Sequence, residues 1–268
     1  MSQDITVFAR WIGDLAYSEI SFGGGEIIYA ASEISPNITA SHDGVLLAAG
    51  AHFTVSLANN INVGTAQLTI TAVENSNYFG SKTVDFDIFP ANLKIIASDK
   101  TVIYGAPIPG DWEFTVEGVG GQNSLAAAGV MGAPEFSTDY NPSSPIGASY
   151  KISPSVGSMI LGNSNYKFVF VDGVLRVNER TVVGAEITVL SAHDYTGLAQ
   201  IPTFEVVVNG VNLVAGTDFT ATFANNINAG ENTAIITVSG IGNYSGEANA
   251  KLYNRQKTDR YYAERRAK

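Results

Sequence analysis

The sequence predicts an all-β chain, built as a tandem array of three β-sandwich modules and ending in a short basic tail. Three observations predict it. The pentapeptide Ala-Asn-Asn-Ile-Asn occurs at 58–62 and again at 224–228, and the same spacing between matching residues holds without a gap over a long stretch. Short runs that alternate apolar and polar residues are separated by turn signals rich in Gly, Asn and Asp. Hydrophobic residues make up 45% of the chain and charged residues only 15%, which favours packed cores over disorder.

The first module is predicted over residues 1–89. FTVSL at 53–57 and AQLTIT at 66–71 alternate as half-buried strands do, and the Asn-rich loop between them predicts a hairpin. Asp43-Gly44 predicts a second, tighter hairpin, because Asp and Gly suit a two-residue turn. DITVF at 4–8 resembles EITVL at 186–190 and is therefore predicted to supply the first strand.

The middle module is predicted over 90–178 and a second copy of the first over 179–254. The middle segment opens with a strand run that leads into Tyr104-Gly105 and closes with Asn165-Tyr166 and a further strand run. Asp172-Gly173 predicts another hairpin turn there. In the repeated copy, Asn209-Gly210 stands at the repeat spacing from Asp43-Gly44 and predicts the same tight turn.

Asn, Gly and Tyr residues mark the repeat and the module ends. Asn and Gly tolerate positive φ, so the loops that they form reverse the chain at little steric cost. Each tyrosine precedes a late strand, where its ring can enter the core while its hydroxyl bonds to backbone. We therefore predict structural roles for all of them. The markers are Asn59, Asn60, Gly64, Tyr78, Tyr166, Asn225, Asn226, Gly230 and Tyr244.

The charge is unevenly distributed between the body of the chain and its last residues. The net charge is −10, and residues 255–268 carry a net +4, which leaves −14 for the rest. An acidic body argues against nucleic acid as a partner. The basic tail predicts a docking segment for a protein partner, and Thr258 or Asp259 is a suitable N-cap for a short helix there. Its predicted docking residues are Arg255, Lys257, Arg260, Tyr261, Tyr262, Arg265, Arg266 and Lys268.

The middle segment resembles the MBG-type modules of large bacterial surface proteins. Five features carry this resemblance: Tyr104-Gly105, Pro145-Ile146-Gly147, Tyr150-Lys151-Ile152, Asn165-Tyr166 and the run DGVLRV at 172–177. The flanking copies resemble a companion repeat of the same proteins, with 216–246 the closer match. The resemblance implies Ig-like β-sandwich modules that act as spacers or adhesive elements and share no common active site. Tailed-phage decoration and fibre proteins carry similar modules.

Residues suited to catalysis or ligand binding are scattered along the chain. His42, His52 and His193 lack the spacing of a metalloprotease, and no Gly-x-Ser-x-Gly elbow is present. Asp85 and Asp87 share one strand face, where a solvated face is a better interpretation than a glycosidase pair. Asp99, Asp111, Asp139 and Asp194 form no calcium loop, so no metal or other cofactor is predicted. Trp11 and Trp112 are candidate glycan-binding or interface aromatics.

These features predict a non-enzymatic structural or adhesive rod, displayed on a particle or a surface and anchored by a terminal segment. A phage virion accessory protein, either a capsid decoration or a fibre, is the leading hypothesis. Its partner would be a capsid, tail or surface-layer subunit, and surface glycans are a further ligand class. The oligomeric state is left open. A segment of a bacterial cell-surface adhesin or S-layer-like protein is the alternative, and a glycan-active enzyme the distant one. No run reaches the ~18 apolar residues of a membrane helix, so no membrane insertion is predicted.

Overall fold

The chain is built almost wholly of β-strands. The computed structural model describes residues 13–191, 193–194 and 196–255, and within them the one helical element is a single 3-10 turn. All strand pairings given for these residues fall inside the ranges 13–89, 91–178 and 180–255. The all-β prediction is confirmed. The helix predicted for the tail lies outside the described residues.

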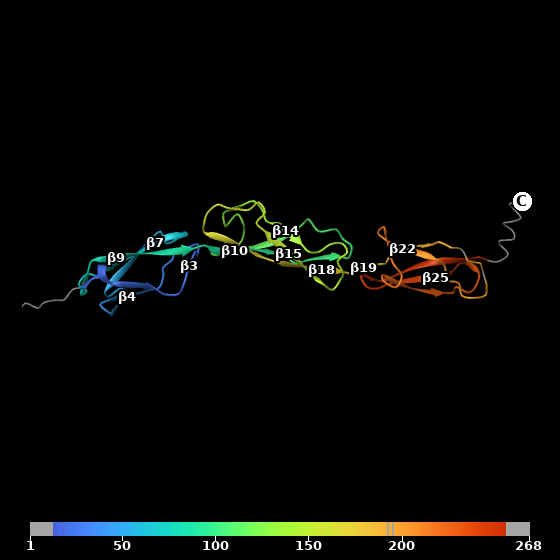
Figure 1. Cartoon of the computed structure of the whole chain (residues 1–268), viewed down its shortest axis with the longest axis horizontal. Coiled ribbons are helices and arrows are strands. Elements are labelled where there is room, and N and C mark those ends of the chain that lie inside the picture. Colours follow the sequence, from blue (N-terminus) through green and yellow to red (C-terminus); the bar gives the residue numbers. More distant parts are fainter. Residues whose placement is uncertain (1–12, 192, 195, 256–268) are drawn as a thin grey trace, which may run out of the picture. The chain divides into compact units, whose positions relative to one another are not determined.

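The first range forms two sheets and a short parallel pair. One sheet has the order β2-β4-β5 and the other β3-β9-β7-β6, while β1 pairs with β8. Strands β7 and β9 run antiparallel from Gly64↔Ile88 to Thr71↔Ser81 (Figure 1). The elements are β1 (Gly13–Asp14), η1 (Leu15–Tyr17), β2 (Glu19–Phe22), β3 (Ile27–Ile28), β4 (Ile38–His42), β5 (Val45–Leu47), β6 (Phe53–Ala58), β7 (Gly64–Ala72), β8 (Tyr78–Phe79) and β9 (Ser81–Phe89).

Both sheets of this range contribute to one core. Ala40 and Leu47 come from the first sheet, and Leu68, Ile70 and Ile88 come from the second. Such a shared core defines a sandwich. The two predicted hairpins of the range are confirmed, because β4 pairs with β5 across the Asp-Gly turn and β6 pairs with β7 across the Asn-rich loop. Asp43 and Gly44 have φ of 48° and 77°, as a two-residue turn requires.

The middle range holds the sheets β12-β10-β17 and β11-β18-β15-β14 and the pair β13-β16. Strand β17 pairs in parallel with β10, whereas β18 pairs with β11 and β15. The predicted hairpin at Asp172-Gly173 is therefore wrong, because the chain passes there from one sheet to the other. The elements are β10 (Ala91–Ala97), β11 (Lys100–Ile103), β12 (Phe114–Glu117), β13 (Val130–Met131), β14 (Glu135–Thr138), β15 (Ser149–Ser155), β16 (Ile160–Leu161), β17 (Tyr166–Val171) and β18 (Gly173–Asn178).

The last range repeats the first. Its sheets are β20-β22-β23 and β21-β27-β25-β24, with β19 paired to β26, and one core draws on both sheets. The Asn209-Gly210 turn between β22 and β23 is confirmed. The elements are β19 (Arg180–Thr181), β20 (Glu186–Val189), β21 (His193–Asp194), β22 (Phe204–Val208), β23 (Val211–Asn212), β24 (Phe219–Ala224), β25 (Gly230–Gly240), β26 (Tyr244–Ser245) and β27 (Glu247–Arg255).

Comparing the copies corrects the prediction for the first strand. Strand β20 pairs with β22 at Glu186↔Val207, and the matching pair in the first copy is Glu19↔Ser41 between β2 and β4. The place of EITVL is therefore held by β2, not by DITVF, and residues 4–8 lie outside the described residues. The spacing between the copies shortens by one across the glycine loop at 23–25, so the first copy has one additional residue in that loop.

Contacts divide the chain into two compact units. Unit 1 comprises 1–98, 113–137 and 153–172, and unit 2 comprises 99–112, 138–152 and 173–268. The first range belongs to unit 1, the last range to unit 2, and strands of the middle range to both. The predicted boundaries at 89/90 and 178/179 stay predictions.

Candidate functional site

Each strand range contains an Asn-Tyr dipeptide that receives the first strand of that range. We call these the Asn-Tyr corners: Asn77-Tyr78, Asn165-Tyr166 and Asn243-Tyr244. The backbone carbonyl of each corner Asn accepts an N–H from the first residue of the range, over 2.9 Å from Gly13, 3.0 Å from Ala91 and 3.0 Å from Arg180. The corner Tyr then opens a parallel pairing with that strand. One local design therefore serves all three corners.

Within unit 1, the corner at Asn165-Tyr166 joins the first range to the middle one. The buried Asn165 side chain accepts the Val63 N–H at 2.9 Å and donates to Asn62 Oδ1 at 3.0 Å. Its own N–H is bonded to Asn163 Oδ1. The oxygen and the NH₂ group of this side chain therefore both have a partner, and both partners come from the loop that contains the repeated pentapeptide.

Within unit 2, the corner at Asn243-Tyr244 is built in the same way. Asn243 Oδ1 accepts the N–H of Ile146 at 3.1 Å. Ile146 belongs to the Pro-Ile-Gly motif on which the resemblance of the middle segment rests. Arg180 adds a bond here that the first junction lacks, because its Nε donates to the Tyr104 carbonyl at 2.7 Å.

Two pairs of tyrosine rings complete the junctions. Tyr29 meets Tyr166 edge to face at 5.4 Å and 82°, and Tyr104 meets Tyr244 at 5.6 Å and 78°. Such T-shaped pairs are favoured by the ring quadrupole. Tyr29 and Tyr104 are held alike, because each N–H bonds to the carbonyl of the last residue of a final strand, Phe89 or Asn178. The two junctions therefore share both their backbone and their ring contacts.

Two of the corner tyrosines, Tyr166 and Tyr244, are buried. The Tyr166 hydroxyl donates to the Val119 carbonyl at 3.2 Å, as predicted for these residues. Loss of hydration on burial raises the pKa of Tyr166 and Tyr244 above the ordinary tyrosine value. A neutral hydroxyl in a packed site is a structural group, so neither tyrosine is poised for acid–base chemistry.

In the Asn-rich loops at 59–64 and 225–230, which we call the end loops, one asparagine turns the chain and the next binds a neighbouring segment. Asn59 and Asn225 take φ of 56° and 54°, which reverses the chain as predicted. Asn60 and Asn226 each hold a neighbouring segment by two bonds. The Asn60 side chain donates to the Ile34 carbonyl, and the Ile34 N–H donates to the Asn60 carbonyl. Asn226 and Gln200 make the same two bonds. The sequence predicted the turn but not these clamps.

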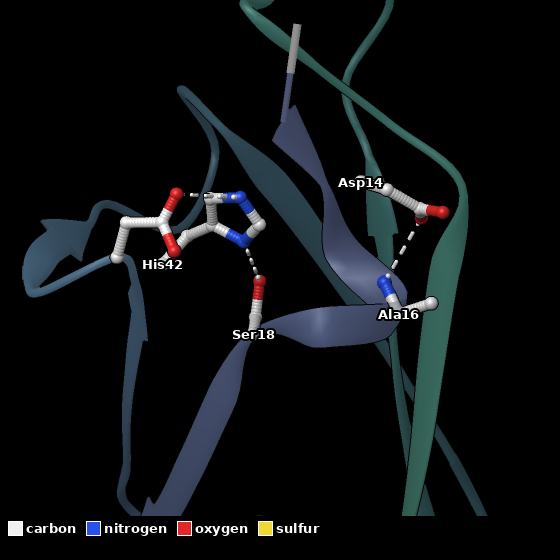
Figure 2. A network of polar contacts seen from close by, with 5 residues as sticks. Asp14, Ala16, Ser18 and His42 are labelled. Carbon is white, nitrogen blue, oxygen red and sulfur yellow. Dashed lines mark hydrogen bonds and ion pairs between the residues drawn. The ribbon is translucent and has the colours of Figure 1, made fainter.

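A polar cluster lies at the start of the described chain. His42 Nδ1 is 3.2 Å from Ser18 Oγ, and His42 Nε2 is 3.7 Å from Asp43 Oδ2, while Asp14 caps η1 by accepting the Ala16 N–H (Figure 2). A hollow of about 540 Å³ adjoins the cluster, and we call it the start hollow. Its lining residues are Gly13, Asp14, Tyr17, His42, Asp43, Val45, Asn77 and Tyr78.

The cluster places a serine, a histidine and an aspartate in line without forming a catalytic triad. Ser18 is 0% exposed, so no substrate carbonyl can reach its hydroxyl. Asp43 is 92% exposed, and 3.7 Å is too long for a hydrogen bond that would orient the ring. The matching positions of the last range hold Ala185, Val208 and Asn209. The cluster is therefore a structural contact that is specific to the first copy. Sequence reasoning missed the Ser18 contact, because 24 residues separate it from His42.

The carboxylates named from the sequence are held by neighbouring donors. Asp85 and Asp87 lie on the exposed face of β9, where they accept bonds from Gln67 and Thr65 at 3.1 and 2.8 Å. This is the solvated face that was predicted. Asp99 and Asp139 accept the N–H groups of Val174 and Lys151, and Lys100 holds the pKa of Asp111 below its usual value. In the described part of the chain, no group of three or more His, Asp or Glu side chains is placed so that it could hold a metal ion.

Most of the predicted docking residues lie beyond the described part of the chain. Trp11 and the tail residues after Arg255 fall there, and β27 ends at Arg255. Trp112 is half-buried between β11 and β12. In the described segments, no helix is long and apolar enough to cross a bilayer. The docking role of the tail and the glycan-binding role of the tryptophans stay predictions.

His52 supplies a side-chain acceptor at a position where the last range has an aspartate. His52 Nδ1 accepts the Ala48 N–H at 2.8 Å, and at the matching position Asp218 Oδ2 accepts the Val214 N–H at 2.8 Å. Removing this acceptor leaves the Ala48 N–H without its side-chain partner. We expect His52→Ala to lower the free energy of unfolding by about 1 kcal/mol.

The measurement is urea unfolding of the wild type, His52→Ala and His52→Asp at pH 7. A carboxylate also accepts the Ala48 N–H, as Asp218 does at the matching position, so His52→Asp should lose less stability than His52→Ala. Equal losses in the two variants would contradict this role of His52.

Comparison with known proteins identifies the type of the middle segment. The family model for the MBG domain (YGX type) matches residues 93–176. This confirms the MBG-type resemblance for that segment, which includes Tyr104 and Ile146 of the second junction. The chain matches none of the curated proteins.

Solved structures similar to the chain include cadherin-domain proteins. Extracellular cadherin domains 1–4 of protocadherin gamma B7 are 12% identical, with 88% of this chain and 76% of that chain covered and a TM-score of 0.22. The protocadherin gamma B4 extracellular domain is 13% identical, with 88% and 51% covered and a TM-score of 0.26. TM-scores at this level carry no argument about function.

Proposed function

We propose that this chain is a non-catalytic structural segment, whose β-sandwich modules are linked in tandem for display on an outer surface. The observation that carries the proposal is the pair of junctions. Both use a corner Asn side chain that accepts an N–H from the preceding range, and both use a T-shaped tyrosine pair. Two junctions built alike favour a spacer made of linked modules.

The chemistry of the polar groups supports a non-catalytic role. Ser18, whose hydroxyl lies 3.2 Å from His42 Nδ1, is buried, and the paired carboxylates of β9 lie on an open strand face bonded to Gln67 and Thr65. The MBG domain match adds a module type that is described by its fold rather than by a reaction. Carboxylates that serve glycoside hydrolysis need a concave site, and an open face does not supply one.

The finer proposal is a virion accessory protein, anchored by its basic tail. It rests on charge: the residues from 255 onward carry +4 against −14 for the rest, which favours docking on an acidic partner surface. The alternative is a segment of a bacterial surface adhesin. Either way, the predicted partner is a protein surface, with surface glycans as the second ligand class.

Antibody labelling tests the display proposal. Antibodies against the purified chain should label intact particles or intact cells from outside, and labelling only after lysis would refute the display proposal. Label on purified phage particles would favour the virion form, and label on cell walls the adhesin form. Deleting residues 256–268 should abolish the label on particles while urea unfolding of the remaining chain stays unchanged. Label that survives the deletion would remove the tail from the anchoring role.

A further inference from the structure

In each strand range, the strand that comes first along the chain pairs in parallel with a strand near the end of that range. Strand β1 pairs with β8, β10 with β17, and β19 with β26. A pull on the two ends of the chain draws the first strand backward along its own axis and the late strand forward. Parallel neighbours then slide along each other, so all the hydrogen bonds between them carry the load at the same time.

The length of this parallel pairing differs between the ranges. In the part of the chain that the structure describes, β1 pairs with β8 over two residues and β19 with β26 over two, and the pairings of β3 with β9 and of β21 with β27 are equally short. Within unit 1, β10 pairs with β17 over six residues, from Ala91↔Tyr166 to Ile96↔Val171. Within unit 2, β11 pairs with β18 in parallel over four.

The long pairings are also better covered by neighbouring strands and side chains. Strand β10 is the middle strand of the sheet β12-β10-β17, and its side chains Leu93 and Ile95 are fully buried. In unit 2, β18 lies between β11 and β15, and Leu175 is fully buried as well. The pairs β1-β8 and β19-β26 each have two strands only. Because water replaces a stretched hydrogen bond where it has access, covered bonds resist a pull for longer.

We propose that this chain is a load-bearing element, in which the middle range is the strongest part and the two flanking copies open first. A load enters the middle range at β10 and leaves it at β18, so the pairings of β10 with β17 and of β11 with β18 both resist it. In each flanking copy, only short parallel pairings resist the same load. Opening under force is governed by the barrier to unfolding, and that barrier is higher where more bonds must break together.

Ordered opening gives the chain a graded response to tension. A flanking copy that opens releases chain at about 3.3–3.6 Å per residue, which relieves the tension before the middle range opens. The MBG-type segment therefore stays folded under a tension that opens its neighbours. The inference goes beyond the display proposal and does not depend on it, because it concerns only the response of the chain to a pull on its two ends.

The first experiment pulls the same strand pair in two directions by optical tweezers. The chain has no cysteine, so two introduced cysteines define where the handles attach. Asn92→Cys with Val171→Cys loads the start of β10 and the end of β17, which makes the strands slide. Asn92→Cys with Ser164→Cys loads the starts of both strands, which separates their bonds one after another. All three positions are exposed, so folding should be unaffected. The sliding direction should need a several-fold higher force.

The second experiment pulls the full chain by tags at its two ends and uses two proline variants of β17. The Ala91 N–H donates to the Asn165 carbonyl, and this register directs the Val169 N–H toward β10 and the Phe170 N–H away from it. Val169→Pro therefore removes a bond of the parallel pairing. Phe170→Pro is the matched control, because β17 is an edge strand and proline is tolerated where the N–H faces outward.

In the wild type, the opening at the highest force should be the one whose force falls in Val169→Pro and stays unchanged in Phe170→Pro. Circular dichroism checks that each variant folds, and the two cysteine variants test the proposal by themselves if Val169→Pro does not. Equal opening forces in the two pulling directions would overturn the proposal. So would an equal fall in both proline variants, or a Val169-sensitive opening that precedes the others.

Discussion

Replacing Tyr166 by alanine is expected to lower the free energy of unfolding by about 3–5 kcal/mol, the range for losing a buried aromatic ring. Tyr166 is 4% exposed and packs in the core formed by Leu93, Ile95 and their neighbours. Its ring also meets Tyr29, and its hydroxyl bonds to the Val119 carbonyl. One substitution therefore removes core packing and a ring contact of the first junction together. Urea unfolding followed by tryptophan fluorescence and circular dichroism measures the loss.

Two further variants separate the ring from the hydroxyl. Tyr166→Phe keeps the ring and loses one hydrogen bond, so a loss of about 1 kcal/mol is expected. Tyr17→Ala changes a side chain that is 80% exposed, and its effect should stay within about 0.5 kcal/mol. A Tyr166→Ala loss no larger than that of Tyr166→Phe would contradict the packing role of the ring.

Replacing Asn165 by leucine is expected to cost about 1–2 kcal/mol at the first junction, because it removes two hydrogen bonds and leaves the half-buried Val63 N–H without its acceptor. Leucine fills similar space but leaves the Val63 N–H and the Asn62 side chain without their partner. Asn243→Leu at the second junction should cost less, because that half-buried side chain makes one such bond instead of two. Urea unfolding of both variants beside the wild type measures the two losses.

A double-mutant cycle assigns the Asn165 effect to the junction. Asn62→Leu removes the same bond from the other side, so the losses of the two variants should add to more than the loss of the double variant. Asn62→Asp retains an acceptor oxygen and should restore most of the stability. Simple additivity of Asn165→Leu and Asn62→Leu would contradict a direct contact in solution.

Local signals in the sequence predicted the strands and most of the turns. Alternation predicted β6 and β7, while Asp43-Gly44 and Asn209-Gly210 predicted the tight hairpins, because φ > 0 at both turn positions admits few residues. At 172–173 the Asp-Gly dipeptide led to a wrong hairpin prediction, because the chain there passes from one sheet to the other. What decides there is the partner of β17, and that partner is β10, a strand far upstream at Ala91–Ala97.

The junctions could be predicted only in part, because their halves are far apart in the sequence. The markers Asn60, Tyr166 and Tyr244 were identified by repetition, and their structural role was predicted from residue type. Their partners were not, because the contact of Asn165 with Val63 spans 102 residues and carries no motif of its own. A signal was nevertheless present, since Tyr29 recurs as Tyr195 at the repeat spacing and Tyr104 opens the middle segment.

The likeness of the two junctions has a consequence for how such chains can change in length. At one junction a corner of the middle range follows the first copy, and at the other a corner of the second copy follows the middle range. The bond from the corner Asn and the tyrosine pair thus recur whichever type of module comes first. Recombination that inserts, deletes or reorders whole modules would therefore leave matching partners at every junction. The number of modules then becomes a trait that selection can adjust in steps of one, without redesigning a single interface.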